Sequence, residues 1–95
     1  PIVALNRFGT LEEAINKVNG TKYGLQASVF TADITRALEC AREIEAGAVL
    51  VNEAPTFRVD NMPYGGTKGS GIGREGPDFA IREMTEEKLI IFDQI

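Results

Sequence analysis

Apolar residues recur along the chain with two different spacings. Short strand-like segments rich in apolar residues predict three β-strands, and stripes that repeat at i, i+3, i+4 and i+7 predict two amphipathic helices between them. In chain order these elements are residues 2–8 (strand), 11–18 (helix), 25–30 (strand), 34–44 (helix) and 48–51 (strand). The last run is apolar at every position, which is typical of a strand covered on both faces.

Residues at the helix ends support these boundaries. Thr10 and Glu13 have the spacing of a capping box, and Asp33 is in the N-cap position of the second helix. Asn19-Gly20 and Gly47 are expected to end the two helices, because both residue types tolerate a positive φ. The connections are short, which favours an α/β sheet with parallel crossovers.

The periodicity disappears after the third strand. Residues 52–75 are expected to form a long loop, and six of the ten glycines lie in residues 65–76. Gly76-Pro77 then predicts the start of a short helix that reaches about Thr85, and residues 88–92 predict a final strand. The predicted fold class is therefore α/β, in the order β-α-β-α-β-long loop-α-β.

Composition narrows the possible functions. The 95 residues include 43% hydrophobic and 25% charged residues, which is typical of a folded soluble protein, and the net charge is −4. These values favour neither a nucleic-acid partner nor a membrane partner. A single cysteine fits a reducing compartment, so a cytoplasmic location is expected. The absence of histidine removes the commonest general base, which makes a self-sufficient enzyme a poor hypothesis.

Two candidate sites have simple structural alternatives. Gly71–Gly76 reads G-x-G-x-x-G and could hold a dinucleotide phosphate, but no predicted strand precedes it, so a turn that allows close packing is the favoured interpretation. Cys40 lies beside the apolar stripe of the second helix with acidic neighbours and no histidine, which favours a packed thiol over a nucleophile.

The long loop also carries candidate binding residues. Phe57 and Tyr64 could line a substrate tunnel, and Arg58 could bind a carboxylate or phosphate; alternatively, the aromatics anchor the loop and Arg58 is solvated. Glu75 is most simply a salt-bridge or capping carboxylate. The apolar run Leu89, Ile90, Ile91 and Phe92 could pair with a strand of its own domain or of another chain.

Three ordered segments together resemble the aldehyde dehydrogenase superfamily. Residues 19–31 match N-x-T-x-Y-G-L-x-x-x-V-F-T, residues 47–52 match G-x-V-x-V-N, and residues 63–75 match P-F-G-G-x-K-x-S-G-x-G-R-E except for Tyr64 in place of Phe. The resemblance covers essentially the whole chain, and the matching segments are similar to the C-terminal end of such enzymes. The apolar start at Pro1, without Met, also suggests a piece of a longer protein.

The resemblance implies a parent enzyme that binds NAD or NADP and oxidises an aldehyde. Its nucleophilic cysteine, general-base glutamate and cofactor domain would lie upstream, so that no catalytic residue or bound cofactor is expected on this chain. Residues 1–86 would be the last part of the catalytic domain, with residues 52–75 as the substrate-side anchor loop and Gly-rich segment. Residues 87–95 would be the oligomerisation strand.

The resemblance also implies roles for individual residues. Phe57 and Tyr64 would line the substrate tunnel, and Glu75 would relay a proton to solvent. The backbone of Lys68 and Gly71 would hold a monovalent cation in some members, and no other metal site is expected.

The anchor loop is most similar to that of members acting on lactaldehyde, glyceraldehyde 3-phosphate or phosphonoacetaldehyde. Arg58 is therefore expected to contact an anionic head group. A homo-oligomer would form through residues 89–92. The alternatives are a self-associating interaction module and a small nucleotide-binding protein.

Overall fold

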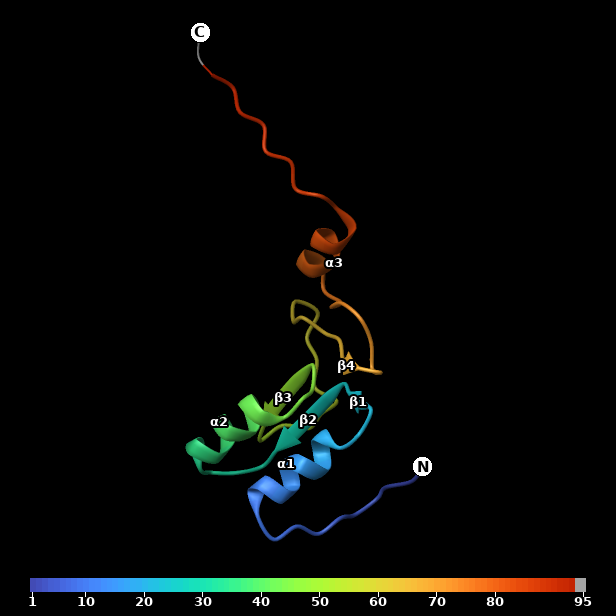
Figure 1. Ribbon diagram of the computed structural model, residues 1–95, viewed down its shortest axis with the longest axis vertical. Helices are drawn as coiled ribbons and strands as arrows, with labels where there is room; N and C mark the ends of the chain where they lie inside the picture. The colour runs from blue at the N-terminus through green and yellow to red at the C-terminus, as the bar shows by residue number, and fades with distance from the viewer. Residues whose placement is uncertain (94–95) are drawn as a thin grey trace.

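The computed structural model describes residues 1–93, which form three helices and two small sheets (Figure 1). No helix in this part of the chain is long and apolar enough to cross a bilayer. In chain order the elements are α1 (Leu11–Asn19), β1 (Tyr23–Gly24), β2 (Gln26–Val29), α2 (Ile34–Glu43), β3 (Ala48–Val51), β4 (Thr67–Lys68) and α3 (Pro77–Met84).

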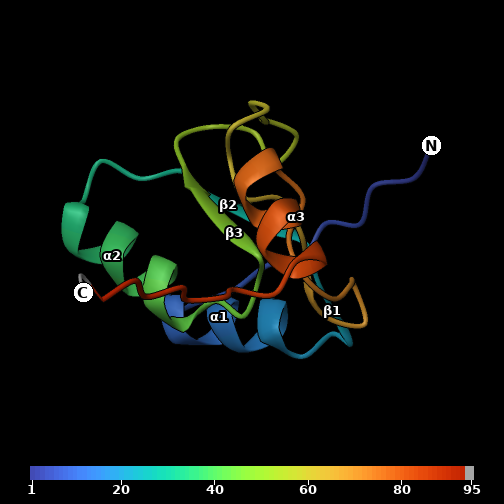
Figure 2. The same ribbon diagram turned by 90° about the horizontal axis from the view of Figure 1, so that it is seen from above.

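The centre of the molecule is a parallel crossover. Strands β2 and β3 pair in parallel from Gln26↔Ala48 to Val29↔Val51, and helix α2 connects them. Helices α1 and α2 lie on the same side of this sheet (Figure 2). The buried apolar core lies between these elements and consists of Ile15, Ala37, Cys40 and Leu50. The predicted α/β class with a parallel crossover is therefore confirmed.

The helix starts agree with the cap signals in the sequence. The Thr10 hydroxyl accepts a hydrogen bond from the Glu13 amide at 3.2 Å, although the Glu13 carboxylate accepts from the Gly9 amide rather than from Thr10. The Asp33 carboxylate accepts from the amides of Thr35 and Arg36, at 2.9 and 3.3 Å. Each acceptor satisfies amides that have no partner within the helix.

The predicted end of the first helix is confirmed, and that of the second is wrong. Helix α1 ends at Asn19 with Gly20 as its C-cap, although Gly20 is in the right-handed region with φ of −69° rather than at a positive φ. Helix α2 ends at Glu43 with Ile44 as its C-cap, before Gly47. Gly47 is needed for a different reason. A Cβ at this position would lie 1.6 Å from the carbonyl oxygen of Gly65, so two backbones meet where no side chain fits.

The expected loop of residues 52–75 contains regular structure. Strand β4 pairs antiparallel with β1 through Tyr23↔Lys68 and Gly24↔Thr67, and an isolated bridge joins Tyr64 to Glu75. Two-residue strands are too short to show a period of two. Their partners lie more than forty residues away along the chain, so the hydrophobic pattern could not reveal them.

The strands expected at residues 2–8 and 88–92 do not form within the described chain. Both segments are extended and project away from the compact part (Figure 1), with Ile2 99% and Phe92 89% exposed. The radius of gyration is 18.4 Å, against about 12 Å for a compact domain of this length. A strand requires a second strand for its backbone hydrogen bonds, and neither segment meets one among residues 1–93. Residues 94 and 95 of the predicted oligomerisation strand lie outside the described residues.

Candidate functional site

The first and third sequence motifs meet at the β1–β4 pair. The Gly69 amide donates to the Lys22 carbonyl at 2.9 Å, and the Gly24 amide donates to the Ser70 hydroxyl at 2.9 Å. The Thr67 hydroxyl lies 3.4 Å from the Gly24 carbonyl and 3.3 Å from the Glu45 carbonyl. The glycines and hydroxyl residues of the two motifs therefore connect distant parts of the chain.

Asn19 and Lys68 complete this junction. The Asn19 side chain donates to the Glu43 carbonyl at 2.7 Å and accepts from the Glu45 amide at 2.8 Å, so it joins the ends of α1 and α2. The Lys68 ammonium donates to the carbonyl of Asn19 at 2.8 Å and forms an ion pair with Glu45. We call this set the motif junction: residues 19–24, 43–47 and 67–70. The roles of Asn19 and Lys68 here are structural, and their place in shared motifs was the only signal for them in the sequence.

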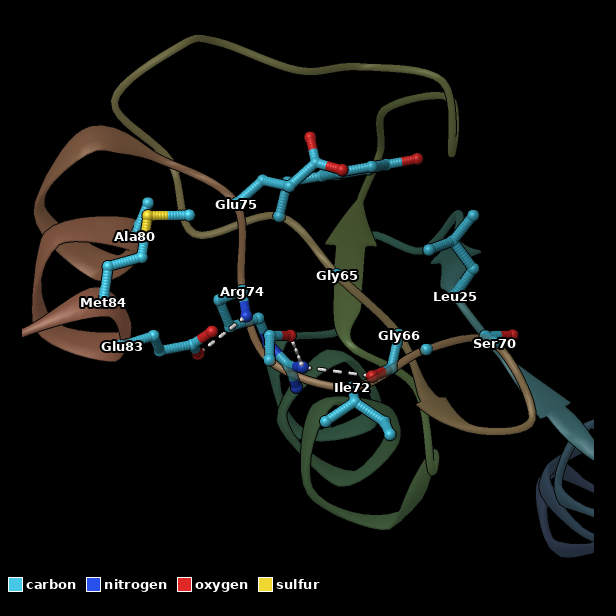
Figure 3. Close-up of a pocket in the computed structure, with 13 residues that line it drawn as sticks. Leu25, Gly65, Gly66, Ser70, Ile72, Arg74, Glu75, Ala80, Glu83 and Met84 are labelled. Atoms are coloured by element: carbon cyan, nitrogen blue, oxygen red, sulfur yellow. Dashed lines mark hydrogen bonds between the residues drawn. The ribbon is translucent and has the colours of Figure 1, made fainter.

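The Gly-rich segment folds around Arg74 (Figure 3). The Arg74 guanidinium donates to the carbonyls of Gly66 and Gly73, at 3.0 and 2.7 Å, while its backbone amide donates to the Glu83 carboxylate at 3.1 Å. A Cβ at Gly73, where φ is +75°, would lie 2.5 Å from a carboxylate oxygen of Glu83. A carboxylate of the chain itself thus lies against the turn where a phosphate would have to bind, which favours the close-packing interpretation of G-x-G-x-x-G.

A cavity of about 600 Å³ lies between this segment and α3. Figure 3 shows Glu75 and Ile72 pointing to opposite sides of the segment, with Met84 and Glu83 projecting from α3. The residues that line the cavity are Leu25, Tyr64, Gly65, Gly66, Ser70, Gly71, Ile72, Gly73, Arg74, Glu75, Ala80, Glu83 and Met84. Tyr64 and Glu75 are the two predicted site side chains that line it.

Three of the predicted site residues form one group. The Arg58 guanidinium lies 4.5 Å from the centroid of the Tyr64 ring, and its Nη2 is 3.1 Å from Oε2 of Glu75. Two backbone hydrogen bonds between Tyr64 and Glu75, of 3.0 and 2.6 Å, hold the bridge beneath them. Phe57 does not line the cavity, and its side chain is 45% exposed.

Other candidates have different environments. Cys40 is 2% exposed, and burial raises the pKa of its thiol, with the nearby Glu39 carboxylate adding to the effect. The neutral thiol is therefore favoured, as expected of a packed cysteine. Among residues 1–93 no cluster of His, Cys, Asp or Glu could hold a metal ion.

Comparisons with known proteins identify the family of the chain. The family model described as "Aldehyde dehydrogenase family" matches residues 1–90. The chain belongs to the aldehyde dehydrogenase family. The resemblance of the three motifs is thereby confirmed.

Individual family members provide more detail. The chain is 53% identical over 93 residues to 3-sulfolactaldehyde dehydrogenase of Priestia aryabhattai, and 52% identical over 91 residues to lactaldehyde dehydrogenase of Methanococcus aeolicus. These matches cover 98% and 96% of this chain and 20% of each relative, so the chain spans about a fifth of their length.

A solved structure of the family has the same fold. The glyceraldehyde-3-phosphate dehydrogenase GapN of Methanocaldococcus jannaschii, in complex with NADP, superposes with a TM-score of 0.74 at 49% identity. The match covers 77% of this chain and 16% of that protein. The relatives are thus oxidoreductases acting on aldehydes, and one of them is seen with NADP.

Proposed function

We propose that this chain is the substrate-side segment of an NAD(P)-dependent dehydrogenase that oxidises a small anionic aldehyde to its acid. The observation that carries the proposal is the position of Arg58. Its guanidinium lies over Tyr64, which lines the cavity and belongs to the third family motif. Two relatives are named for substrates that carry a sulfonate or a phosphate, 3-sulfolactaldehyde and glyceraldehyde 3-phosphate.

In this proposal the chain supplies side chains that bind the substrate, and it supplies no group that reacts with the aldehyde. Its one thiol, Cys40, is buried and favours the neutral form, so it is unsuited to attack an aldehyde carbonyl. The nucleophile and the general base would come from the remaining four-fifths of the protein. We therefore expect the isolated chain to be inactive.

A nicotinamide cofactor would accept the hydride that leaves the substrate, but the described residues do not fit a dinucleotide. The Arg74 guanidinium and the Glu83 carboxylate both form hydrogen bonds with the Gly-rich turn. The negative charge of Glu83 would repel a pyrophosphate. Cofactor binding is therefore assigned to other parts of the enzyme.

The side chains of this segment would orient the substrate. Arg58 presents a planar set of donors that suits a sulfonate, phosphate or carboxylate head group. Tyr64 supplies an aromatic wall and a hydroxyl to the cavity. Glu75, whose side chain is 66% exposed, connects the Tyr64 backbone with solvent and is suited to relay a proton. Lys68 and Gly71 remain candidates for a monovalent cation bound through their carbonyls.

The remaining roles concern assembly and location. Leu89, Ile90, Ile91 and Phe92 are 65–89% exposed in an extended backbone, so we propose that they add a strand to a neighbouring subunit. The same exposure supports the second candidate function, a self-associating module. A cytoplasmic location suits the free thiol of Cys40.

A chimaeric enzyme tests the proposal. The 95 residues replace the matching fifth of the Priestia 3-sulfolactaldehyde dehydrogenase, and NAD(P)H formation is measured with 3-sulfolactaldehyde and with uncharged lactaldehyde. Arg58→Ala should raise KM for 3-sulfolactaldehyde about tenfold or more, as expected for loss of a charged hydrogen bond, and should change KM for lactaldehyde little. Arg36→Ala, which removes an exposed arginine from α2, is the matched control.

Equal effects of Arg58→Ala on the two substrates would refute the role of Arg58. An inactive chimaera that is correctly folded would count against the assignment of the segment. Aldehyde oxidation by the isolated 95 residues would contradict the expected division of roles.

A further inference from the structure

We propose that Glu75 is an exchangeable counter-ion of Arg58, which an anionic ligand displaces when it binds the guanidinium. This inference rests on the proposed function for the identity of the ligand, a small sulfonate, phosphate or carboxylate. The exchange itself follows from the contacts of three side chains, and it makes Glu75 a determinant of anion affinity.

The Arg58–Glu75 contact uses little of the guanidinium. One nitrogen, Nη2, donates to one carboxylate oxygen at 3.1 Å, and no other hydrogen bond of this guanidinium is recorded within residues 1–93. An arginine can donate five hydrogen bonds, and two parallel bonds to one oxyanion are its strongest arrangement. The pair observed here is therefore weaker than the one that a well-placed ligand could make.

The exposure of the pair also favours exchange. The side chains of Arg58 and Glu75 are 41% and 66% exposed, so water screens their attraction. Exposed pairs of this kind typically stabilise a protein very little. Breaking the contact therefore costs little, and the freed carboxylate is readily hydrated.

The surrounding structure holds Arg58 in place during the exchange. The Tyr64 ring lies 4.5 Å below the guanidinium and attracts it as a cation over an aromatic face. The two backbone hydrogen bonds of the Tyr64–Glu75 bridge fix the main chain of both residues. Only the Glu75 side chain has to rotate, so the guanidinium stays beside Tyr64 while its partner changes.

The proposal predicts that one substitution in the binding site increases the affinity for an anion. Glu75→Gln keeps the shape of the side chain and one acceptor oxygen but removes the negative charge that competes with the ligand. Anion affinity should therefore increase. A purely structural role for the ion pair predicts the opposite, because Arg58 would lose its positioning partner.

Binding to the 95-residue chain tests the exchange without enzymatic activity. Propanesulfonate is titrated against the labelled protein, and the NMR signal of the Arg58 Nε–Hε group is followed; uncharged propanesulfonamide is the matched control ligand. Glu75→Gln should lower the Kd for propanesulfonate about two- to fivefold, which corresponds to removal of a weak surface pair. Glu53→Gln, which removes a charge from the same loop, should have a smaller effect.

A double-mutant cycle shows whether the effect acts through Arg58. Because Arg58→Gln removes the Arg58 NMR signal, binding in all four proteins of the cycle is measured by isothermal titration calorimetry. Arg58→Gln should abolish the binding of propanesulfonate, and Glu75→Gln should then produce no tightening. An unchanged or raised Kd for Glu75→Gln would overturn the proposal, as would equal tightening without Arg58. In the chimaeric enzyme, Glu75→Gln should lower KM for 3-sulfolactaldehyde relative to lactaldehyde, whatever its effect on kcat. Anion exchange at Arg58 in an inactive chimaera would refute the proposed function alone.

Discussion

The motif junction consists mostly of glycines and polar residues, whereas the two terminal segments are rich in apolar residues that favour strands, yet only the junction has regular structure. At the junction, backbone groups of β1 meet those of β4, and Asn19 and Lys68 supply further hydrogen bonds. Residues 2–8 and 88–92 are equally extended, but they find no partner strand among residues 1–93, and the Arg7 carbonyl accepts only a side-chain hydrogen bond, from Lys17 at 2.6 Å.

The difference shows that pairing depends on a partner rather than on the apolar pattern. The junction carries its partners within the chain, over separations of 22 to 49 residues. The terminal segments need a partner from another segment or another chain, because an unpaired strand has unsatisfied amides and carbonyls. Stability should therefore be concentrated at the junction and interaction at the ends.

The largest loss of stability is expected from Gly47→Ala. The added Cβ would lie 1.6 Å from the Gly65 carbonyl oxygen, and the atoms that it would meet belong to the backbone of Gly65 and Leu25, which cannot rotate away. The free energy of unfolding should fall by about 3 kcal/mol or more, measured by urea denaturation. Gly9→Ala is the control, because its Cβ would meet nothing closer than the Glu13 carboxylate at 3.6 Å. Equal stability of the two variants would mean that the junction is not closely packed.

A smaller loss is expected from Asn19→Ala. The change removes both hydrogen bonds that join the ends of α1 and α2, so unfolding should become easier by about 1–2 kcal/mol. Thermal melting followed by circular dichroism should show a lower Tm. Asn16→Ala is the matched control, since its side chain is exposed on the same helix and makes no hydrogen bond within residues 1–93. Equal Tm values for the two variants would show that the Asn19 hydrogen bonds contribute nothing to stability.

Substitutions in the C-terminal segment should barely change folding. Leu89→Ser with Ile91→Ser alters two exposed side chains, so the free energy of unfolding of the monomer should change by less than about 0.5 kcal/mol. Self-association, measured by sedimentation velocity, should weaken instead. A large loss of monomer stability would show that the segment packs within its own chain.

The smallest effect is expected from pH at the start of α1. The hydrogen bond from the Gly9 amide, and then the contact with Lys17, lowers the pKa of Glu13 from its ordinary value of 4.5. Since the folded state binds this proton less readily than the unfolded chain, the stabilisation is present above pH 4.5 and disappears as pH falls through the lower folded pKa. Glu13→Gln should reduce the acid-induced fall in Tm. Glu12→Gln leaves the contacts of Glu13 with Gly9 and Lys17 intact, so this variant should retain the full acid-induced fall in Tm.

Much of the local structure could be predicted from the sequence. The apolar stripes located α1 and α2, the Thr10 and Asp33 caps located their starts, and the uniformly apolar run located β3. These features depend on neighbours within one or two turns. The ordered motifs likewise sufficed to recognise the aldehyde dehydrogenase family, because three spaced matches are far more specific than one.

The candidate site was only partly predictable. Phe57, Arg58, Tyr64 and Glu75 stood out by residue type, but nothing in their spacing showed that Arg58 would pair with Glu75 over Tyr64 while Phe57 stays outside. The contact of Glu83 with the Gly-rich turn was also missed. Each of these contacts joins residues that only the folded backbone brings together.

The sequence by itself determined the two helices, the parallel crossover and the family, because hydrophobic periodicity, cap chemistry and motif spacing are properties of short stretches of chain. Only the tertiary structure decided which extended segments become strands, why Gly47 must lack a side chain, and which carboxylates meet Arg58 and Arg74. The physical reason is that a hydrogen bond, an ion pair or a close backbone approach needs two partners in space, and residue order alone does not specify the second one.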